Sequence, residues 1–103
     1  MSQTETPAKP TTRTTATSAR PPLWKVILLN DDVTPREFVV KVLRRVFRMT
    51  EDEATAVMLT AHRRGACVVA VFTREVAETK AEQANEAGRR AGYPLALTTE
   101  REE

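Results

Sequence analysis

The sequence predicts a single small α+β domain with the element order β-α-α-β-α-β. Two observations predict it: apolar runs rich in β-branched residues are typical of strands, and helical stripes follow capping boxes of the form Thr-x-x-Glu. For so few elements, the compact arrangement is a three-stranded antiparallel sheet with three helices packed on one face. The 103 residues have room for only one such domain.

The chain begins with a polar segment, residues 1–22 (MSQTETPAKPTTRTTATSARPP). Seven of the first twenty residues are Thr, and Met1 is their only large apolar residue. Such a segment cannot bury enough surface to offset its ordering entropy. We therefore expect a disordered N-terminal arm over 1–22, a folded domain over 23–100 and a charged end over 101–103.

The first strand and helix follow directly. Residues 23–30 (LWKVILLN) predict a buried strand. For the helix predicted over 35–48, Thr34 is a favoured N-cap, Pro35 suits the first helical position and Glu37 completes a capping box. Its apolar residues recur at helical spacing: Phe38, Val39, Val42, Leu43, Val46 and Phe47.

The second helix has signals at both ends. It begins at the capping box of residues 50–53 (TEDE) and ends near Gly65, with Arg63 and Arg64 in its last turn. One face is marked by Ala54, Val57, Met58, Ala61 and His62.

The remaining elements are a strand, a helix and a strand. Residues 66–72 (ACVVAVF) predict a second buried strand, and residues 95–99 (LALTT) predict a short final one. Between them, Thr73 is expected to cap a helix that Gly92 and Pro94 stop. Its inward positions are small, which allows close packing: Ala77, Ala81, Ala84 and Gly88.

Composition excludes several classes of protein. One cysteine excludes an internal disulfide and a multi-Cys zinc site, and one histidine excludes the His-pair motifs of zinc proteases. No apolar run approaches the roughly 20 residues of a membrane-spanning helix. The net charge of +2 lies in residues 1–20, because residues 21–103 sum to zero.

A local basic group stands out on the first predicted helix. A solvated helix face explains it best, and RNA binding is the alternative. Its members are Arg36, Lys41, Arg44, Arg45 and Arg48.

Two sets of residues could carry chemistry. The turn Asn30-Asp31-Asp32 and His62 together form an acceptor-rich group for a cation, either a metal ion or an ammonium. Adjacent Asp residues rarely supply two ligands of one tetrahedral site, so we expect no metal. Cys67 and His62 could act as nucleophile and base, but the position of Cys67 in an apolar strand favours an inert thiol.

With these residues in view, the chain resembles the ClpS family, adaptors of the bacterial and plastid Clp protease. The matching stretches are WKVILLNDDVTPREFVVKVL (24–43), ATAVMLTAHRRG (54–65), VFTREVAETK (71–80) and GYPLALT (92–98). The resemblance implies a non-enzymatic adaptor that binds destabilising N-terminal residues, chiefly Phe, Leu, Trp and Tyr. The adaptor then hands the captured protein to a hexameric AAA+ unfoldase.

The resemblance also implies the setting of that function. The partners would be N-degron proteins and the N-terminal domain of a ClpA- or ClpC-type unfoldase, with no cofactor, nucleic acid or membrane. The chain would be a monomer in the bacterial cytoplasm rather than the plastid stroma. Two other function classes remain open: a domain that docks on the unfoldase without reading N-termini, and a small metal- or Cys-dependent enzyme.

The same resemblance implies three groups of site residues. Asn30, Asp32 and His62, with Asp31 beside them, would bind the N-terminal amine. Glu75 and Lys80 would dock on the unfoldase. The side-chain pocket would be formed by Thr34, Arg36, Val39, Met58, Ala61 and Leu95.

Two of these pocket positions depart from the family pattern. Relatives commonly have Met in place of Arg36 and Val in place of Ala61. We therefore expect a preference for Phe, Tyr and Trp over Leu.

Overall fold

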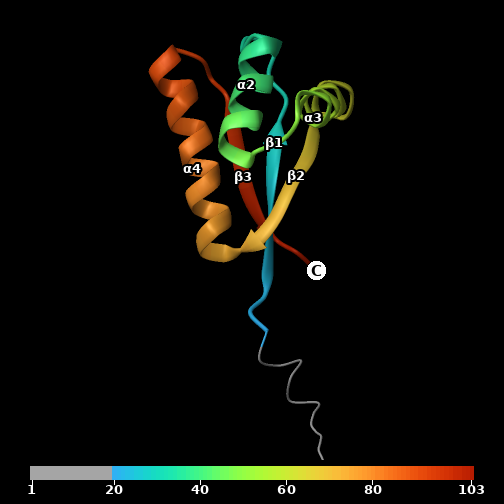
Figure 1. Ribbon diagram of the computed structural model, residues 1–103, viewed down its shortest axis with the longest axis vertical. Coiled ribbons are helices and arrows are strands. Elements are labelled where there is room, and N and C mark those ends of the chain that lie inside the picture. Colours follow the sequence, from blue (N-terminus) through green and yellow to red (C-terminus); the bar gives the residue numbers. More distant parts are fainter. Residues whose placement is uncertain (1–19) are drawn as a thin grey trace, which may run out of the picture.

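Three antiparallel strands form one sheet in the order β2-β1-β3, where β1 is Leu23–Leu29, β2 is Ala66–Thr73 and β3 is Ala96–Arg101 (Figure 1). The computed structural model describes residues 20–103, so most of the predicted disordered arm lies outside the described residues. The predicted element order, β-α-α-β-α-β, is confirmed.

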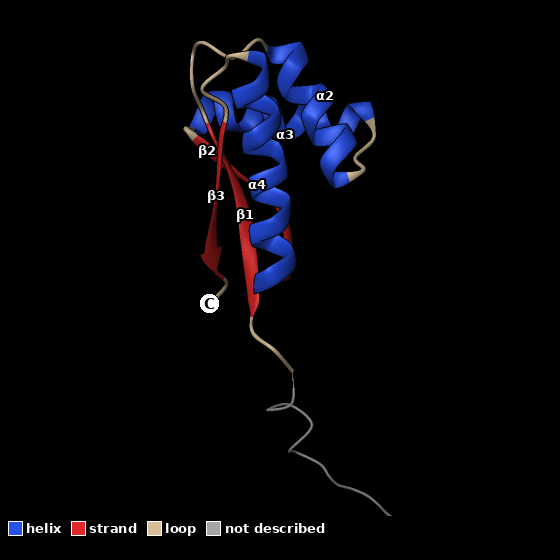
Figure 2. Ribbon diagram, turned by 90° about the vertical axis from the view of Figure 1, so that its left-hand side faces the viewer, coloured by secondary structure: helices blue, strands red, loops and turns tan. Residues whose placement is uncertain are grey.

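Three helices cover one face of the sheet: α2 (Arg36–Phe47), α3 (Glu51–Arg64) and α4 (Arg74–Ala91) (Figure 2). Their inner faces and the central strand β1 form the hydrophobic core, in which Val26 and Leu43 are fully buried. Among residues 20–103, no helix combines the length and apolar character needed to span a membrane.

Small residues on α4 allow it to pack closely against the segment that leads into β3. The predicted inward positions are all buried: Ala77, Ala81, Ala84 and Gly88. A Cβ atom added at Gly88 would lie 2.8 Å from the Cβ of Leu95. The Asn85 side chain binds the backbone of Leu97, two residues after Leu95. It accepts from the Leu97 N–H (2.8 Å) and donates to the Leu97 carbonyl (3.0 Å). These contacts fix the position of Leu95 relative to α4.

Helix capping differs between α2 and α3. The predicted box on α3 is confirmed, because Glu53 N–H donates to Thr50 Oγ1 and Thr50 N–H donates to the Glu53 side chain. The predicted Thr34 cap on α2 is wrong: Pro35 is the N-cap and no side chain caps that helix. The Thr34 hydroxyl instead donates to Asp31, three residues earlier, at 2.9 Å.

Two strand predictions also need correction. No residue of β2 is fully buried, and Val68 and Val71 are 46% and 37% exposed. The reason is that β2 is an edge strand and the helices cover only one face of the sheet. The last strand continues to Arg101 instead of ending at residue 99, because Glu100 and Arg101 pair with Lys25 and Trp24 of β1.

Candidate functional site

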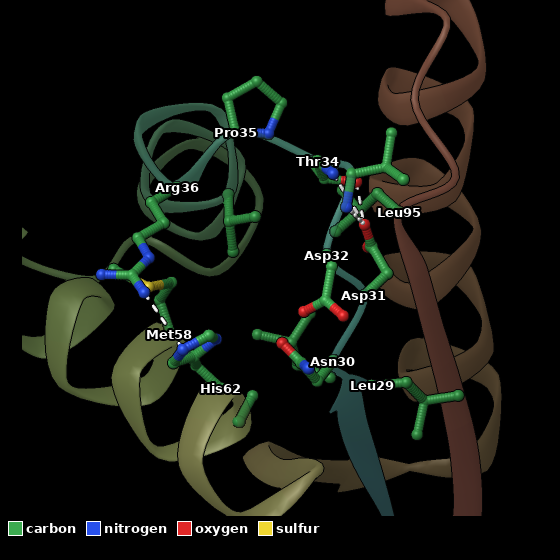
Figure 3. A pocket seen from close by; sticks show the side chains of 14 residues that line it. Leu29, Asn30, Asp31, Asp32, Thr34, Pro35, Arg36, Met58, His62 and Leu95 are labelled. Atoms are coloured by element: carbon green, nitrogen blue, oxygen red, sulfur yellow. Dashed lines mark hydrogen bonds between the residues drawn. The ribbon is translucent and has the colours of Figure 1, made fainter.

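A cavity of about 290 Å³ lies where the central strand β1 ends and the chain turns into α2 (Figure 3). Residues from this turn, from α2 and α3, and from the segment before β3 line it. They include all ten residues that the family resemblance assigned to amine binding and to the pocket: Asn30, Asp31, Asp32, Thr34, Arg36, Val39, Met58, Ala61, His62 and Leu95. The fold thus brings four separate segments to one site.

The inner part of the cavity is apolar. Val39 comes from α2, Met58 and Ala61 come from α3, and Leu95 precedes β3; each is less than 10% exposed. The volume is at the small end for ligand sites, so it suits one side chain better than a large cofactor. Full burial of a Phe or Leu side chain stabilises a complex by roughly 1.5–3 kcal/mol.

Asp31 holds the turn that forms one wall. Its Oδ1 accepts from the amides of Val33 (2.9 Å) and Thr34 (2.6 Å), and its Oδ2 accepts from the buried Thr34 hydroxyl. Partial burial raises the pKa of the Asp31 carboxyl, but the hydrogen bonds from Thr34 and Val33 outweigh it and bring the pKa below its ordinary value. Both carboxylate oxygens of Asp31 are therefore occupied within the turn.

Three polar side chains surround the mouth of the cavity. Figure 3 shows Asn30 and Asp32 on one side of the opening and His62 of α3 facing them. All three are exposed, so His62 does not lie on the inward face that its spacing predicted. The backbone N–H of Asn30 donates to the Gly65 carbonyl at 3.0 Å, which ties the turn to the end of α3. The arrangement offers several acceptors to a small cation.

Arg36 contacts His62 across the mouth, with Nη2 3.1 Å from Nε2 (Figure 3). A guanidinium can only donate, so Nε2 must be the acceptor and the neutral imidazole carries its proton on Nδ1. A ligand ammonium can use Nε2 only after Arg36 releases it. No sequence pattern predicts this contact, because the two residues are 26 positions apart.

Cys67 is separate from this site. Its Sγ lies 3.5 Å from the Val68 carbonyl, and burial raises the pKa of the thiol despite the opposing effects of Arg64 and Thr60. A raised pKa disfavours the thiolate, as expected for an inert cysteine. Within residues 20–103, no group of three or more His, Cys, Asp or Glu side chains could hold a metal ion.

The two residues assigned to docking lie on α4, outside the cavity. Glu75 is exposed in the first turn of the helix. Lys80 is half-buried, and its Nζ donates to the Val46 carbonyl near the end of α2 at 3.0 Å. Lys80 therefore also helps to hold α2 and α4 together.

Four further residues line the cavity: Leu28, Leu29, Val33 and Pro35. Leu28 could have been found from the strand pattern, since it alternates with the buried Val26. Val33 is 67% exposed, and nothing in its sequence context marks it as part of a site.

The chain matches the family model of the ATP-dependent Clp protease adaptor protein ClpS over residues 19–98. The chain belongs to the ClpS family. ClpS 1 of Bradyrhizobium diazoefficiens is 66% identical over 95 residues, which are 92% of this chain and 94% of that one. ClpS 2 of Mesorhizobium japonicum is 60% identical over 99 residues, 96% of this chain and 98% of that one.

A solved ClpS structure has the same fold. Agrobacterium tumefaciens ClpS2 bound to L-phenylalaninamide superposes with a TM-score of 0.80 at 60% identity, covering 81% of this chain and all of that one. The family and fold that the sequence predicted are thus confirmed.

Proposed function

We propose that this ClpS protein is an adaptor that binds Phe, Tyr, Trp or Leu at the N-terminus of substrate proteins and delivers those proteins to a Clp AAA+ unfoldase-protease. The observation that carries the proposal is the pairing of acceptors at the cavity mouth with an apolar interior. An N-terminal residue presents a cationic amine next to its side chain, so one site of this kind can bind both.

Asn30, Asp32 and His62 would bind the amine. Asp32 supplies the negative charge, and charge-assisted hydrogen bonds are roughly twice as strong as neutral ones. Asp31 would act indirectly, because its carboxylate is already engaged by Val33 and Thr34. Its role would be to hold Asp32 and Asn30 in place.

The apolar interior would bind the first side chain. L-Phenylalaninamide, the molecule bound by Agrobacterium tumefaciens ClpS2, has a free amine, a benzyl side chain and an amide in place of a carboxylate. It is therefore a small stand-in for the start of a polypeptide. Its chemistry supports the same ligand class for the present cavity.

Delivery would use the surface of α4. Glu75, in the first turn of that helix, would contact the N-terminal domain of a ClpA- or ClpC-type unfoldase, with Lys80 beside it. Since the cavity residues lie on other elements, one molecule could hold substrate and unfoldase together. No covalent step on this chain is required.

Binding of two peptides that differ only at the amine tests the proposal. A fluorescent peptide with a free N-terminal Phe and its N-acetylated form would be titrated with the protein. Acetylation removes the charge and leaves acceptors without a donor, so affinity should fall about a hundredfold, or roughly 3 kcal/mol.

A variant at Asp32 tests whether the peptide amine binds at the mouth of this cavity. Asp32→Asn should weaken the free peptide strongly and the acetylated one hardly at all. Equal affinity of the wild-type protein for both peptides would contradict N-terminal recognition. If such a protein still bound the unfoldase domain, the chain would be a docking module that does not read N-termini.

A further inference from the structure

A second, basic groove begins at the mouth of the cavity. It has a volume of about 1090 Å³ and runs between α2 and the first half of α3. The two spaces share Arg36 and Met58 as lining residues. Figure 3 shows these two residues on the side of the cavity opposite Asp31 and Leu95. A chain leaving the cavity on that side enters the groove.

The groove has an unbalanced charge. Five cationic residues line it against Glu37 and Glu51: Arg36, Lys41, Arg44, Arg45 and Arg48. Because residues 21–103 have no net charge, this excess of positive charge is matched by an acidic excess elsewhere on the domain. The positive charge is therefore concentrated beside the cavity.

Most of these cations have no partner among the residues that the structure describes. Within residues 20–103, Arg44 is the only one of the five with an ion pair, at 3.8 Å from Glu51. Lys41, Arg45 and Arg48 are exposed and form no side-chain hydrogen bond to other described residues. An acidic occupant would reduce the repulsion among them.

The groove is also long enough to hold several residues of an extended polypeptide. From Arg36 to Arg48 the chain advances 12 residues along α2 and its C-cap, about 18 Å at ~1.5 Å per residue. An extended polypeptide covers that distance with about five residues at ~3.3 Å each.

We propose that the groove binds acidic residues at about positions 2–6 of the captured polypeptide, so that this protein prefers N-terminal aromatic residues followed by Asp or Glu. The inference rests on the proposed function, because the first residue must occupy the cavity. The charge complementarity and the continuity of the two spaces favour this occupant over RNA, which has no cationic ammonium group to place at Asn30, Asp32 and His62.

The test uses three peptides that begin with Phe and carry at positions 2–6 alternating Gly and Ser, Asp and Glu, or Lys and Ser. We expect the acidic peptide to bind about three- to tenfold more tightly than the neutral one, as two or three exposed ion pairs would allow, and the basic peptide to bind more weakly. Raising the ionic strength should reduce these differences, because salt screens exposed charges.

Two double variants assign the effect to the groove. Lys41→Glu with Arg44→Glu should remove the preference for the acidic peptide and leave the neutral peptide unchanged within about twofold. Arg20→Glu with Arg101→Glu makes the same change in net charge at exposed positions outside the groove, and it should retain the preference.

The outcomes separate the two proposals. Equal binding of acidic and neutral peptides, or a preference that persists in the groove variant, overturns the groove inference while the cavity function stands. Equal binding of the free and N-acetylated acidic peptides would show that the groove binds polyanions without the cavity, and it also overturns the groove inference. If the neutral Phe peptide does not bind at all, the proposed function itself is wrong.

Discussion

Arg36 lies at the mouth of the cavity and contacts His62 there. The guanidinium must stay hydrated or paired, so it lines the entrance with a polar group where Met would offer a flexible apolar wall. An aromatic ligand can stack against it and gain roughly 0.5–1 kcal/mol, whereas Leu cannot. We therefore expect Arg36 to influence which N-terminal side chain the cavity prefers.

Arg36→Met should therefore lower the ratio of Phe-peptide to Leu-peptide affinity by about two- to fivefold, the factor that corresponds to the stacking energy. Fluorescence anisotropy with both peptides measures the ratio. Arg63→Met, on an exposed arginine of α3 that does not line the cavity, is the control and should keep the wild-type ratio. The same ratio in wild type and Arg36→Met would show that Arg36 has no influence on the first side chain.

Asp31 makes the free energy of unfolding depend on pH in the acidic range. Its carboxyl has a lower pKa in the folded protein than the ordinary 3.8, so its stabilising effect is present above pH 3.8 and is lost as pH falls through the folded pKa. Asp31→Asn should lower the free energy of unfolding by about 1–2 kcal/mol at pH 7. The difference from wild type should shrink towards pH 3.

Urea unfolding at pH 7 and pH 3 measures this difference. Asp32→Asn provides a neighbouring control, because its carboxylate accepts no hydrogen bond from the described residues. It should show the wild-type response to pH. An Asp31→Asn protein whose stability changes with pH as steeply as wild type would rule out this account of the turn.

The turn also shows what local patterns miss. Thr34, Pro35 and Glu37 have the spacing of a capping box, yet the Thr34 hydroxyl bonds to Asp31. In a capping box the Thr34 N–H would donate to the Glu37 side chain, but here it donates to the carboxylate of Asp31 at 2.6 Å, and Pro35 is the N-cap in place of Thr34. The pattern predicted Glu37 as the acceptor for the Thr34 N–H, and the carboxylate of Asp31 takes that place.

At the scale of elements, α4 determines the position of Leu95, which lines the apolar inner part of the cavity. Gly88 lies against Leu95, and a methyl group at position 88 would come within 3.4 Å of the Tyr93 carbonyl as well as 2.8 Å of the Leu95 Cβ. The segment before β3 would have to move away from the helix.

Gly88→Ala should destabilise the protein by about 1–3 kcal/mol, although Ala favours a helix over Gly by about 1 kcal/mol. It should also weaken binding of a Phe peptide, because Leu95 lines the cavity. Thermal unfolding and peptide titration measure the two effects. Gln83→Ala, at an exposed position of the same helix, should change neither. A Gly88→Ala protein as stable as wild type would mean that the helix and this segment can separate freely.

The elements differ in how far the sequence determines them. The capping box at Thr50 and the small residues of α4 act locally or on one face, and both predictions are confirmed. The burial of β2 and the length of β3 depend on which strand is central and which partners are available. An apolar run alone contains neither piece of information.

At the scale of the whole molecule, the residues proposed for docking and for substrate binding lie on different parts of the fold. Glu75 is 13 residues before Gly88 on α4, which is about 20 Å along the helix. Glu75→Lys should abolish binding to the N-terminal domain of a ClpA-type unfoldase and leave Phe-peptide affinity unchanged within about twofold. Loss of peptide binding in a folded variant would show that the two surfaces overlap.

A Lys80 variant should differ from the Glu75 variant in its effect on stability. Because its ammonium donates to the Val46 carbonyl, Lys80→Glu should lower the free energy of unfolding as well as affect docking. Calorimetry and unfoldase binding on the same protein separate the two effects. An unchanged unfolding temperature would indicate that the contact between α4 and α2 adds no stability.

The residues that line the site could be predicted, whereas the contacts among them could not. The resemblance implied ten cavity residues, and all ten line one cavity. The contact between Arg36 and His62 and the continuity of the cavity with the basic groove could not be predicted, since both depend on how α2 packs against α3. Side-chain geometry between distant segments is set by packing, and a sequence pattern describes only neighbours.

The hydrogen bonds of Asn85 to strand β3 oppose aggregation in concentrated solution. Strand β3 is at the edge of the sheet, where free backbone groups can recruit a strand from another copy and start an aggregate. The side chain of Asn85 already occupies the amide and carbonyl of Leu97, so an incoming strand would have to break two hydrogen bonds before forming its own. One amide side chain thereby protects the β3 edge of the sheet at Leu97.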